Sequence, residues 1–226
     1  MNTFRVLSSL LTYPSQDLVA ALPEMKEILA QEGLLLEPDQ NTLAPLFTEL
    51  AAMDIYDLQA RYVELFDQFR SFSLHLFEHA HGESRDRGQA MVSLLERYRE
   101  TGLELSALEL PDFLPVYLEY LSQLPLEDAR RELAEPVAVI ATLARRLAKK
   151  GSSYAGVLAA LEHIAEAEPS PSDLEELAFE EAEDTARLQA LDAEWQEEPV
   201  DFSKSEAAFV GRLLARSSGA ASRKEH

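Results

Sequence analysis

Two histidines and a glutamate near the middle of the chain have the spacing of a zinc motif. His75, Glu78 and His79 fit the pattern H-x-x-E-H, in which two histidines one helical turn apart bind zinc and the glutamate acts as a base. A catalytic zinc needs a third protein ligand, which enzymes with this pattern supply from a much larger fold that contains a sheet. Because this chain is short and helical in composition, we expect the histidines to satisfy polar needs near the end of a buried helix. A non-catalytic metal site that also uses His81 is the alternative.

The next residues along the chain, Gly82–Gly88, are rich in charge and glycine. Arg87 and Gly88 precede Met91 by four and three residues, so they extend the apolar face of the following helix toward its start. A glycine on a packing face indicates a close approach of another helix, and an arginine there needs an acidic partner. The candidate partners are Glu83, Asp86 and the acids near Asp112. The segment is interpreted either as a buried ion pair or as part of a ligand groove.

Composition excludes several other kinds of chemistry. The chain has no cysteine, which rules out disulfides, thiol nucleophiles and iron–sulfur ligation and fits the reducing cytoplasm. No glycine-rich phosphate loop and no G-x-S-x-G elbow occurs. The formal net charge of −21 opposes binding to nucleic acid or to an anionic membrane and favours a basic partner such as a cationic peptide. The N-terminus lacks a signal-peptide pattern and no apolar stretch reaches about 18 residues, so we expect neither export nor membrane spanning.

Helices are the expected secondary structure throughout. Long stretches rich in Leu, Ala and Glu, with only eight glycines, favour helix and predict an all-α protein. Ser15, Asp54 and Asp112 stand where they can cap helix N-termini. Residues 69–81 are apolar on two sides, which is typical of a buried helix. The expected helices cover approximately residues 4–11, 15–31, 39–52, 54–66, 69–81, 84–101, 112–121, 127–149 and 153–166.

The length of the chain fits one main domain. We assign residues 1–166 to a helical domain, residues 167–202 to an acidic, loosely packed segment, and residues 203–226 to a C-terminal helix and a disordered tail. From Glu162 to Glu198 the chain carries fourteen acidic residues and one basic residue, Arg187. Such a run is typical of a solvated helix face or of a loosely held segment.

Four rows of sequence carry a resemblance to a known family. Residues 73–91, SLHLFEHAHGESRDRGQAM, resemble the signature of the molybdenum cofactor assembly chaperones of nitrate reductase, also called delta subunits. The likeness continues in YVELFD, residues 62–67, and in ELPDFLPVYLEYL, residues 109–121; the row ALDAEWQEEPVDF, residues 190–202, resembles the acidic segment of the family. His75 departs from the family pattern, and the residues after Phe202 match no known pattern. The resemblance implies a single-domain, all-α bundle of the molybdoenzyme-specific chaperone type, located in the cytoplasm, with no catalytic activity and no cofactor or metal of its own.

The resemblance also implies a partner and a site. Members of the family bind the N-terminus of the catalytic (alpha) subunit of respiratory nitrate reductase, keep it competent for molybdenum cofactor insertion and delay its docking to the membrane. We place the peptide groove between the helix that ends near residue 81, the helix that starts near residue 84 and the helix that follows residue 112. Its expected lining is Glu78, His79, His81, Arg85, Arg87, Glu109, Asp112, Tyr117 and Tyr120. The acids would face basic residues of the peptide, and the tyrosines would supply contact area. The alternative is a chaperone of the same fold that proofreads the twin-arginine signal of an exported molybdoenzyme, and the sequence leaves the oligomeric state open.

Overall fold

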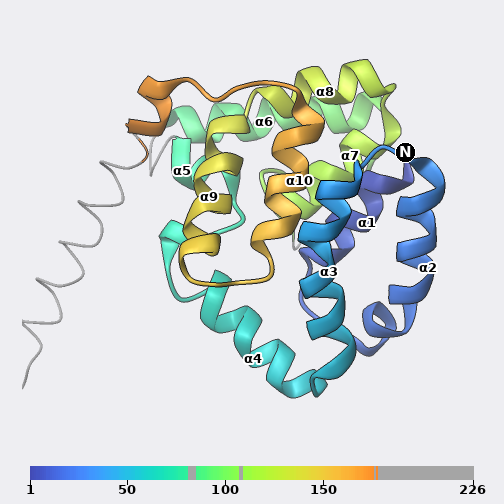
Figure 1. Cartoon of the computed structure of the whole chain (residues 1–226). Coiled ribbons are helices and arrows are strands. Elements are labelled where there is room, and N and C mark those ends of the chain that lie inside the picture. Colours follow the sequence, from blue (N-terminus) through green and yellow to red (C-terminus); the bar gives the residue numbers. More distant parts are fainter. Residues whose placement is uncertain (81–84, 107–108, 176, 178–226) are drawn as a thin grey trace, which may run out of the picture. The chain divides into compact units, whose positions relative to one another are not determined.

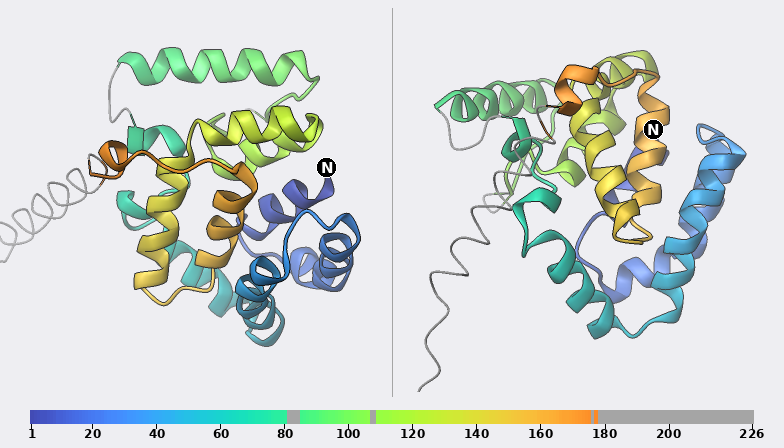
Figure 2. Two further views of the ribbon diagram at one scale, coloured as in Figure 1. Left: turned by 45° about the horizontal axis from the view of Figure 1, so that its top comes forward. Right: turned by 60° about the vertical axis from the view of Figure 1, so that its left-hand side comes forward.

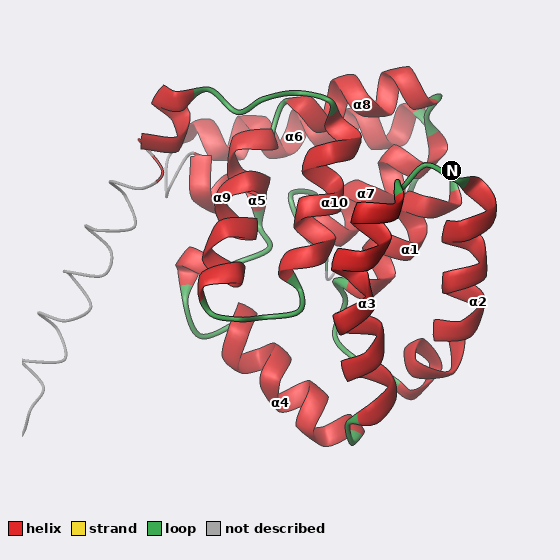
Figure 3. Cartoon of the chain, viewed as in Figure 1, coloured by secondary structure: helices red, strands yellow, loops and turns green. Residues whose placement is uncertain are grey.

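Helices make up the regular structure of the chain, which is described by a computed structural model for residues 1–80, 85–106, 109–175 and 177 (Figure 1). No β-strand is found within these ranges (Figure 3). The α-helices are α1 (Asn2–Leu10), α2 (Gln16–Glu32), α3 (Glu37–Ala52), α4 (Ile55–Phe66), α5 (Leu76–Ala80), α6 (Arg85–Glu100), α7 (Leu114–Gln123), α8 (Leu126–Ala134), α9 (Val137–Lys149) and α10 (Ala155–Ala165), with a short 3₁₀ helix η1 (Arg70–Phe72) before α5. The prediction of an all-α fold is confirmed.

Side-chain caps fix two helix starts that the sequence predicted. The Ser15 hydroxyl oxygen accepts a hydrogen bond from the backbone N–H of Leu18 at 3.1 Å, and the Asp54 carboxylate accepts one from the N–H of Tyr56 at 2.9 Å. Each bond satisfies an N–H group that has no partner inside its helix. Pro115 lies in the first turn of α7, where its missing N–H does no harm.

The core lies within one compact unit, Met1–Glu181. Helix α10 packs along α9 and α3, and α1 packs along α7 and α2 (Figure 1). The side chains that close these contacts are fully buried, among them Leu7, Leu43, Leu118, Ile140 and Leu161. The second unit, Ala182–His226, lies outside the described residues, so the predicted domain boundaries at residues 166 and 202 and the predicted C-terminal helix stay predictions.

The prediction of a single buried helix over residues 69–81 is wrong. The segment begins with η1, continues through extended residues that pair with the start of α7, and becomes helical only at Leu76. The N–H of Leu76 donates to the carbonyl of Asp112 at 2.9 Å, and the N–H of Leu114 donates to the carbonyl of Leu74 at 2.9 Å. An apolar run that is buried on both sides satisfies its backbone in either way, so periodicity does not distinguish the two conformations.

The predicted helix over residues 127–149 is also wrong as one element, because it is divided into α8 and α9. Pro136 stands between them and forms the N-cap of α9. A proline has no N–H to continue the hydrogen bonds of α8, so the helix ends there although Glu135 still has helical backbone angles. The break turns the chain, so that Glu135 and Val139 both reach the cavity described below.

Gly88 does not mark a close helix approach, so this interpretation was wrong. It is exposed in α6, and no atom of a neighbouring element lies within 4 Å of the position that a Cβ would take. The close approach occurs instead at Gly156 in α10, where a Cβ would lie 2.2 Å from the carbonyl oxygen of Thr42 in α3. Gly88 follows Arg87 directly and therefore lies about 100° around the helix from it, so the two residues need not share the same surroundings.

Helix α6 lies at the edge of the unit, alongside α8 (Figure 2). Its fully or nearly buried apolar side chains are Leu94 and Tyr98. The Tyr98 hydroxyl donates to the carbonyl of Pro111 at 2.6 Å, and its ring lies against the ring of Tyr120 at 4.9 Å between centroids. The remainder of α6 is joined to its surroundings through charged side chains, which belong to the candidate site.

Candidate functional site

Asp112 is the centre of a buried polar network that joins the segments before α5 and α7. Its side chain is fully buried, and its two carboxylate oxygens have separate partners. One oxygen lies 3.1 Å from Nδ1 of His75, and the other accepts a hydrogen bond from the N–H of Phe77 at 3.3 Å. The prediction that Asp112 caps α7 is wrong, because Phe113 is the N-cap and no side chain caps that helix. Asp112 is instead directed toward the residues of α5.

Arg87 extends this network to α6. Its guanidinium lies 3.5 Å from the Glu78 carboxylate and 3.6 Å from the Asp112 carboxylate. The predicted candidate partners of this arginine were Glu83, Asp86 and the acids near Asp112. Asp112 is one of its partners, whereas Glu83 and the side chain of Asp86 lie outside the described residues. The Asp112 side chain is wholly buried. The side chains of Arg87 and Glu78 are mostly buried, with about a fifth and a quarter of their surface exposed. Breaking such a pair from one side leaves a charge in a poorly solvated place, which is strongly unfavourable.

His79 is buried in α5 and does not face solvent. Its Nε2 lies 2.8 Å from the carbonyl oxygen of Ser73, and because a carbonyl only accepts, Nε2 carries the proton. Burial lowers the pKa of His79 below its usual value, while the hydrogen bond to Ser73 acts in the opposite direction. The imidazole is therefore held neutral at physiological pH.

This shift of the His79 pKa predicts an acid-sensitive fold. Because the pKa is lower in the folded protein than in the unfolded chain, the unfolded chain binds more protons once the pH falls below about 6.5. The contribution is complete above that pH and decreases as the pH falls toward the folded pKa. Urea unfolding between about pH 8 and about pH 5 should show a smaller loss of stability in His79→Gln than in the unchanged protein. An equal loss in both proteins would show that another group is responsible.

The H-x-x-E-H pattern does not adopt the geometry of a zinc motif. Helix α5 begins at Leu76, so His75 precedes the helix and does not stand one helical turn before His79. The two imidazoles are directed to different partners, Asp112 for His75 and the backbone of Ser73 for His79. Within the described part of the chain, no group of three histidine, aspartate or glutamate side chains could hold a metal ion. His75 and His79 therefore do not form the pair of ligands that the pattern describes, and His81, the further residue of the alternative metal site, lies outside the described residues.

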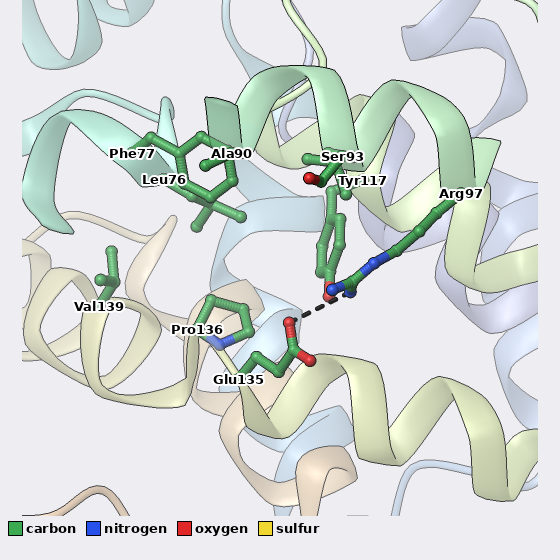
Figure 4. Close-up of a pocket in the computed structure, with 10 residues that line it drawn as sticks. Leu76, Phe77, Ala90, Ser93, Arg97, Tyr117, Glu135, Pro136 and Val139 are labelled. Carbon is green, nitrogen blue, oxygen red and sulfur yellow. Dashed lines mark hydrogen bonds and ion pairs between the residues drawn. The ribbon is translucent and has the colours of Figure 1, made fainter. Parts of the chain in front are cut away.

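A cavity of about 310 Å³ opens beside this network, between α5, α6, α7 and the junction of α8 with α9 (Figure 4). Its walls are mainly apolar, with charged side chains at one side. The lining residues are Leu76, Phe77, Ala90, Ser93, Leu94, Arg97, Tyr117, Glu135, Pro136 and Val139. A partly apolar pocket of this size with a few polar groups is the usual form of a binding site.

Arg97 of α6 spans the charged side of the cavity. Its guanidinium lies 2.6 Å from the Glu132 carboxylate and 3.2 Å from the Glu135 carboxylate (Figure 4 draws the pair with Glu135). Partial burial acts to lower the pKa of Arg97, but the two carboxylates outweigh it and raise that pKa. The Tyr117 hydroxyl donates to the backbone carbonyl of Glu132 at 2.7 Å, so the Tyr117 ring of α7 lines the cavity next to α8.

The structure brings together only some of the predicted lining residues. Glu78, Arg87 and Asp112 meet in the network, and Tyr117 reaches the cavity. Tyr120 is 4% exposed and packs on Tyr98, behind the cavity. Glu109 is exposed. Burial of Glu119 in α7 raises the pKa of Glu119, and the nearby charge of Glu109 raises it further. His81 and the side chain of Arg85 lie outside the described part of the structure.

Sequence reasoning missed the cavity residues on α8 and α9 and the cation opposite them. Arg97, Glu132, Glu135, Pro136 and Val139 were assigned no role. One signal was available, because Pro136 predicts a break that exposes the ends of the two flanking helices. Nothing in the local sequence indicates that Arg97 pairs with acids about 35 residues away.

The fold and the cavity define an all-α binding domain, and comparison with known proteins identifies its family. The family model of the nitrate reductase delta subunit matches residues 15–160, and the chain belongs to this family. It is 46% identical to the nitrate reductase molybdenum cofactor assembly chaperone NarJ of Escherichia coli (strain K12), over 87% of this chain and 83% of that protein. It is 39% identical to the probable chaperone NarW of the same strain, over 92% of this chain and 86% of that protein. It is 32% identical to the probable chaperone NarJ of Bacillus subtilis (strain 168), over 72% of this chain and 89% of that protein.

The helices within the described ranges were also considered as membrane spans. None of them is both long enough and apolar enough to cross a membrane. The most apolar faces of these helices are used in the core instead.

Proposed function

We propose that this protein is an assembly chaperone for the molybdenum-containing catalytic subunit of respiratory nitrate reductase, and that it acts in the cytoplasm by binding the N-terminus of that subunit. The names of the three relatives support the assembly role. The chaperone has no catalytic step of its own. The observation that carries the binding mode is the cavity beside α6, because it combines apolar walls with a charged side that holds Arg97 and Glu135.

The chemistry of the cavity matches an amphipathic, basic segment. Leu76, Phe77 and Val139 offer apolar surface for an anchor side chain, and Glu135 offers a carboxylate that is 61% exposed. Helix-in-groove binding uses an apolar stripe for affinity, and charge complementarity raises the rate of encounter. The net charge of −21 adds a long-range attraction for a basic client.

The mechanism is differential binding. The chaperone binds the catalytic subunit while its N-terminus is accessible and holds it in a state that is open to cofactor insertion. When the cofactor is in place and the subunit closes around its own N-terminus, the accessible state is lost and the chaperone dissociates. Docking of the subunit to its membrane partner is delayed for as long as the N-terminus is bound.

Phe77→Ala should weaken the binding of the client by about tenfold, because it removes an aromatic wall of the cavity. Calorimetric titration with a peptide that copies the N-terminus of the nitrate reductase catalytic subunit from the same organism measures the change. Tyr56→Ala is the matched control, since Tyr56 is an aromatic residue of α4 that is 77% exposed and does not line the cavity.

Three results of that titration have different meanings. Binding that Phe77→Ala weakens and Tyr56→Ala does not would support both the client and the cavity. No binding to the unchanged protein would contradict the proposed client. Tighter binding of a twin-arginine signal peptide from an exported molybdoenzyme would assign the protein to a different reductase.

A further inference from the structure

At one side of the cavity, Arg97 of α6 pairs with Glu132 of α8 and with Glu135, which follows α8. This cluster has the form of a recognition site for a cation that is already occupied. We propose that Glu132 and Glu135 form a subsite for a basic side chain of the client, and that Arg97 occupies this subsite until a client displaces it. The inference rests on the proposed function, since it concerns how the client segment is recognised. It adds residues of α6 and α8 to the site.

The position of the pair is the first argument. Arg97 and Glu135 both line the cavity, so a segment that enters the cavity contacts their ion pair as well as the apolar wall (Figure 4). The Arg97 side chain is 40% exposed, and Glu135 is 61% exposed. An ion pair with this much solvent contact is weak and exchanges readily.

The partial burial of Glu132 is the second argument. Its side chain is only 17% exposed, so its carboxylate is poorly solvated and requires a cation close by. Exchange of the Arg97 guanidinium for an arginine or lysine of the client keeps that requirement satisfied throughout. A client without a basic residue at this position would leave Glu132 paired with Arg97. It would then have to enter a cavity in which the Arg97 side chain still occupies the charged side.

The attachment of α6 is the third argument. Arg97 holds the C-terminal part of the helix to α8, whereas Arg87 holds its N-terminal part to Glu78 and Asp112. The two arginines are ten residues apart, which is about 15 Å along a helix. Helix α6 also supplies Ala90, Ser93 and Leu94 to the wall of the cavity. Release of Arg97 would therefore free the charged side of the cavity while Tyr98 and Arg87 keep the helix in place.

The internal cation lowers the apparent affinity for the client, because part of the binding energy is used to displace it. Arg97→Gln should tighten the binding of the N-terminal peptide of the catalytic subunit by about threefold to tenfold, measured by calorimetric titration at low salt. Arg99→Gln is the matched control. It makes the same change of charge two residues later in α6, at an exposed side chain that does not line the cavity, and we expect it to alter the affinity by about twofold or less.

A double-mutant cycle separates competition from a general change of charge. In a Glu132→Gln, Glu135→Gln background the peptide should bind more weakly, and Arg97→Gln should then have no further effect. Circular dichroism of each variant checks that α6 and the core remain folded.

The outcomes are distinguishable. If the peptide does not bind the unchanged protein, the proposed function fails and the subsite fails with it. If the peptide binds but Arg97→Gln weakens the binding, or changes it only as much as Arg99→Gln, the proposed function stands and the subsite is wrong. Equal tightening by Arg97→Gln with and without Glu132 and Glu135 would also overturn the subsite.

Discussion

Replacement of Asp112 by alanine should lower the free energy of unfolding by about 3–5 kcal/mol. The carboxylate is fully buried, accepts from the N–H of Phe77 and the His75 ring, and forms an ion pair with the Arg87 guanidinium. Its removal leaves the N–H of Phe77 without its acceptor and takes from Arg87 one of its two carboxylate partners, in a place that is poorly solvated. Urea unfolding at neutral pH, followed by circular dichroism, measures the loss.

Two variants test whether the charge or the shape of Asp112 matters. Asp112→Asn keeps an oxygen that can accept from Phe77 but loses the negative charge beside Arg87, so we expect a smaller but clear loss of stability. Glu109→Gln removes a carboxylate three residues earlier at an exposed position and should change stability by about 0.5 kcal/mol or less. If Asp112→Ala were as stable as Glu109→Gln, the network would have no structural importance.

Replacement of Gly156 by alanine should destabilise the fold by about 3 kcal/mol. The added Cβ would lie 2.2 Å from the carbonyl oxygen of Thr42 and 2.8 Å from its carbonyl carbon, and backbone atoms do not move aside as a flexible side chain does. Helices α3 and α10 would have to separate, and buried side chains such as Leu43 and Leu161 would lose contact.

Gly88→Ala is the matched comparison, because the same methyl group is added in another helix. Gly88 is exposed and its Cβ position is open, so alanine should stabilise α6 by about 0.5–1 kcal/mol through its better helix propensity. Thermal unfolding of both variants gives the two signs in one experiment. A stable Gly156→Ala protein would mean that α3 and α10 have room to shift.

Local signals allowed much of the fold to be predicted from the sequence. Ser15 and Asp54 cap their helices as expected, because a cap depends on residues within one turn. Residues 73–75 were assigned wrongly, because their conformation depends on hydrogen bonds to a segment that lies far along the chain. The break at Pro136 follows a local rule, because proline interrupts a helix. The prediction of one continuous helix gave more weight to the apolar pattern on both sides of Pro136 and was wrong.

The candidate site divides in the same way. The acids near Asp112 were among the predicted partners of Arg87, together with Glu83 and Asp86, since a buried arginine needs an acid. The pairing of Arg97 with Glu132 and Glu135 was missed, because Arg97 comes from a helix whose approach to α8 is a matter of tertiary packing. Sequence reasoning also placed Tyr120 in the groove, although its ring packs on Tyr98.

The pairing between residues 74–76 and 112–114 affects how changes in α6 are transmitted. The chain leaves this pairing at Leu76, passes through α6 and returns at Asp112, so the excursion is closed at its base by two backbone hydrogen bonds. Tyr98 fastens α6 within this excursion, because its ring packs on Tyr120 of α7 and its hydroxyl donates to the carbonyl of Pro111. The closed base and this anchor keep the core in register when charged side chains of α6 change partners, so the cavity can change at Arg97 without a rearrangement of the backbone.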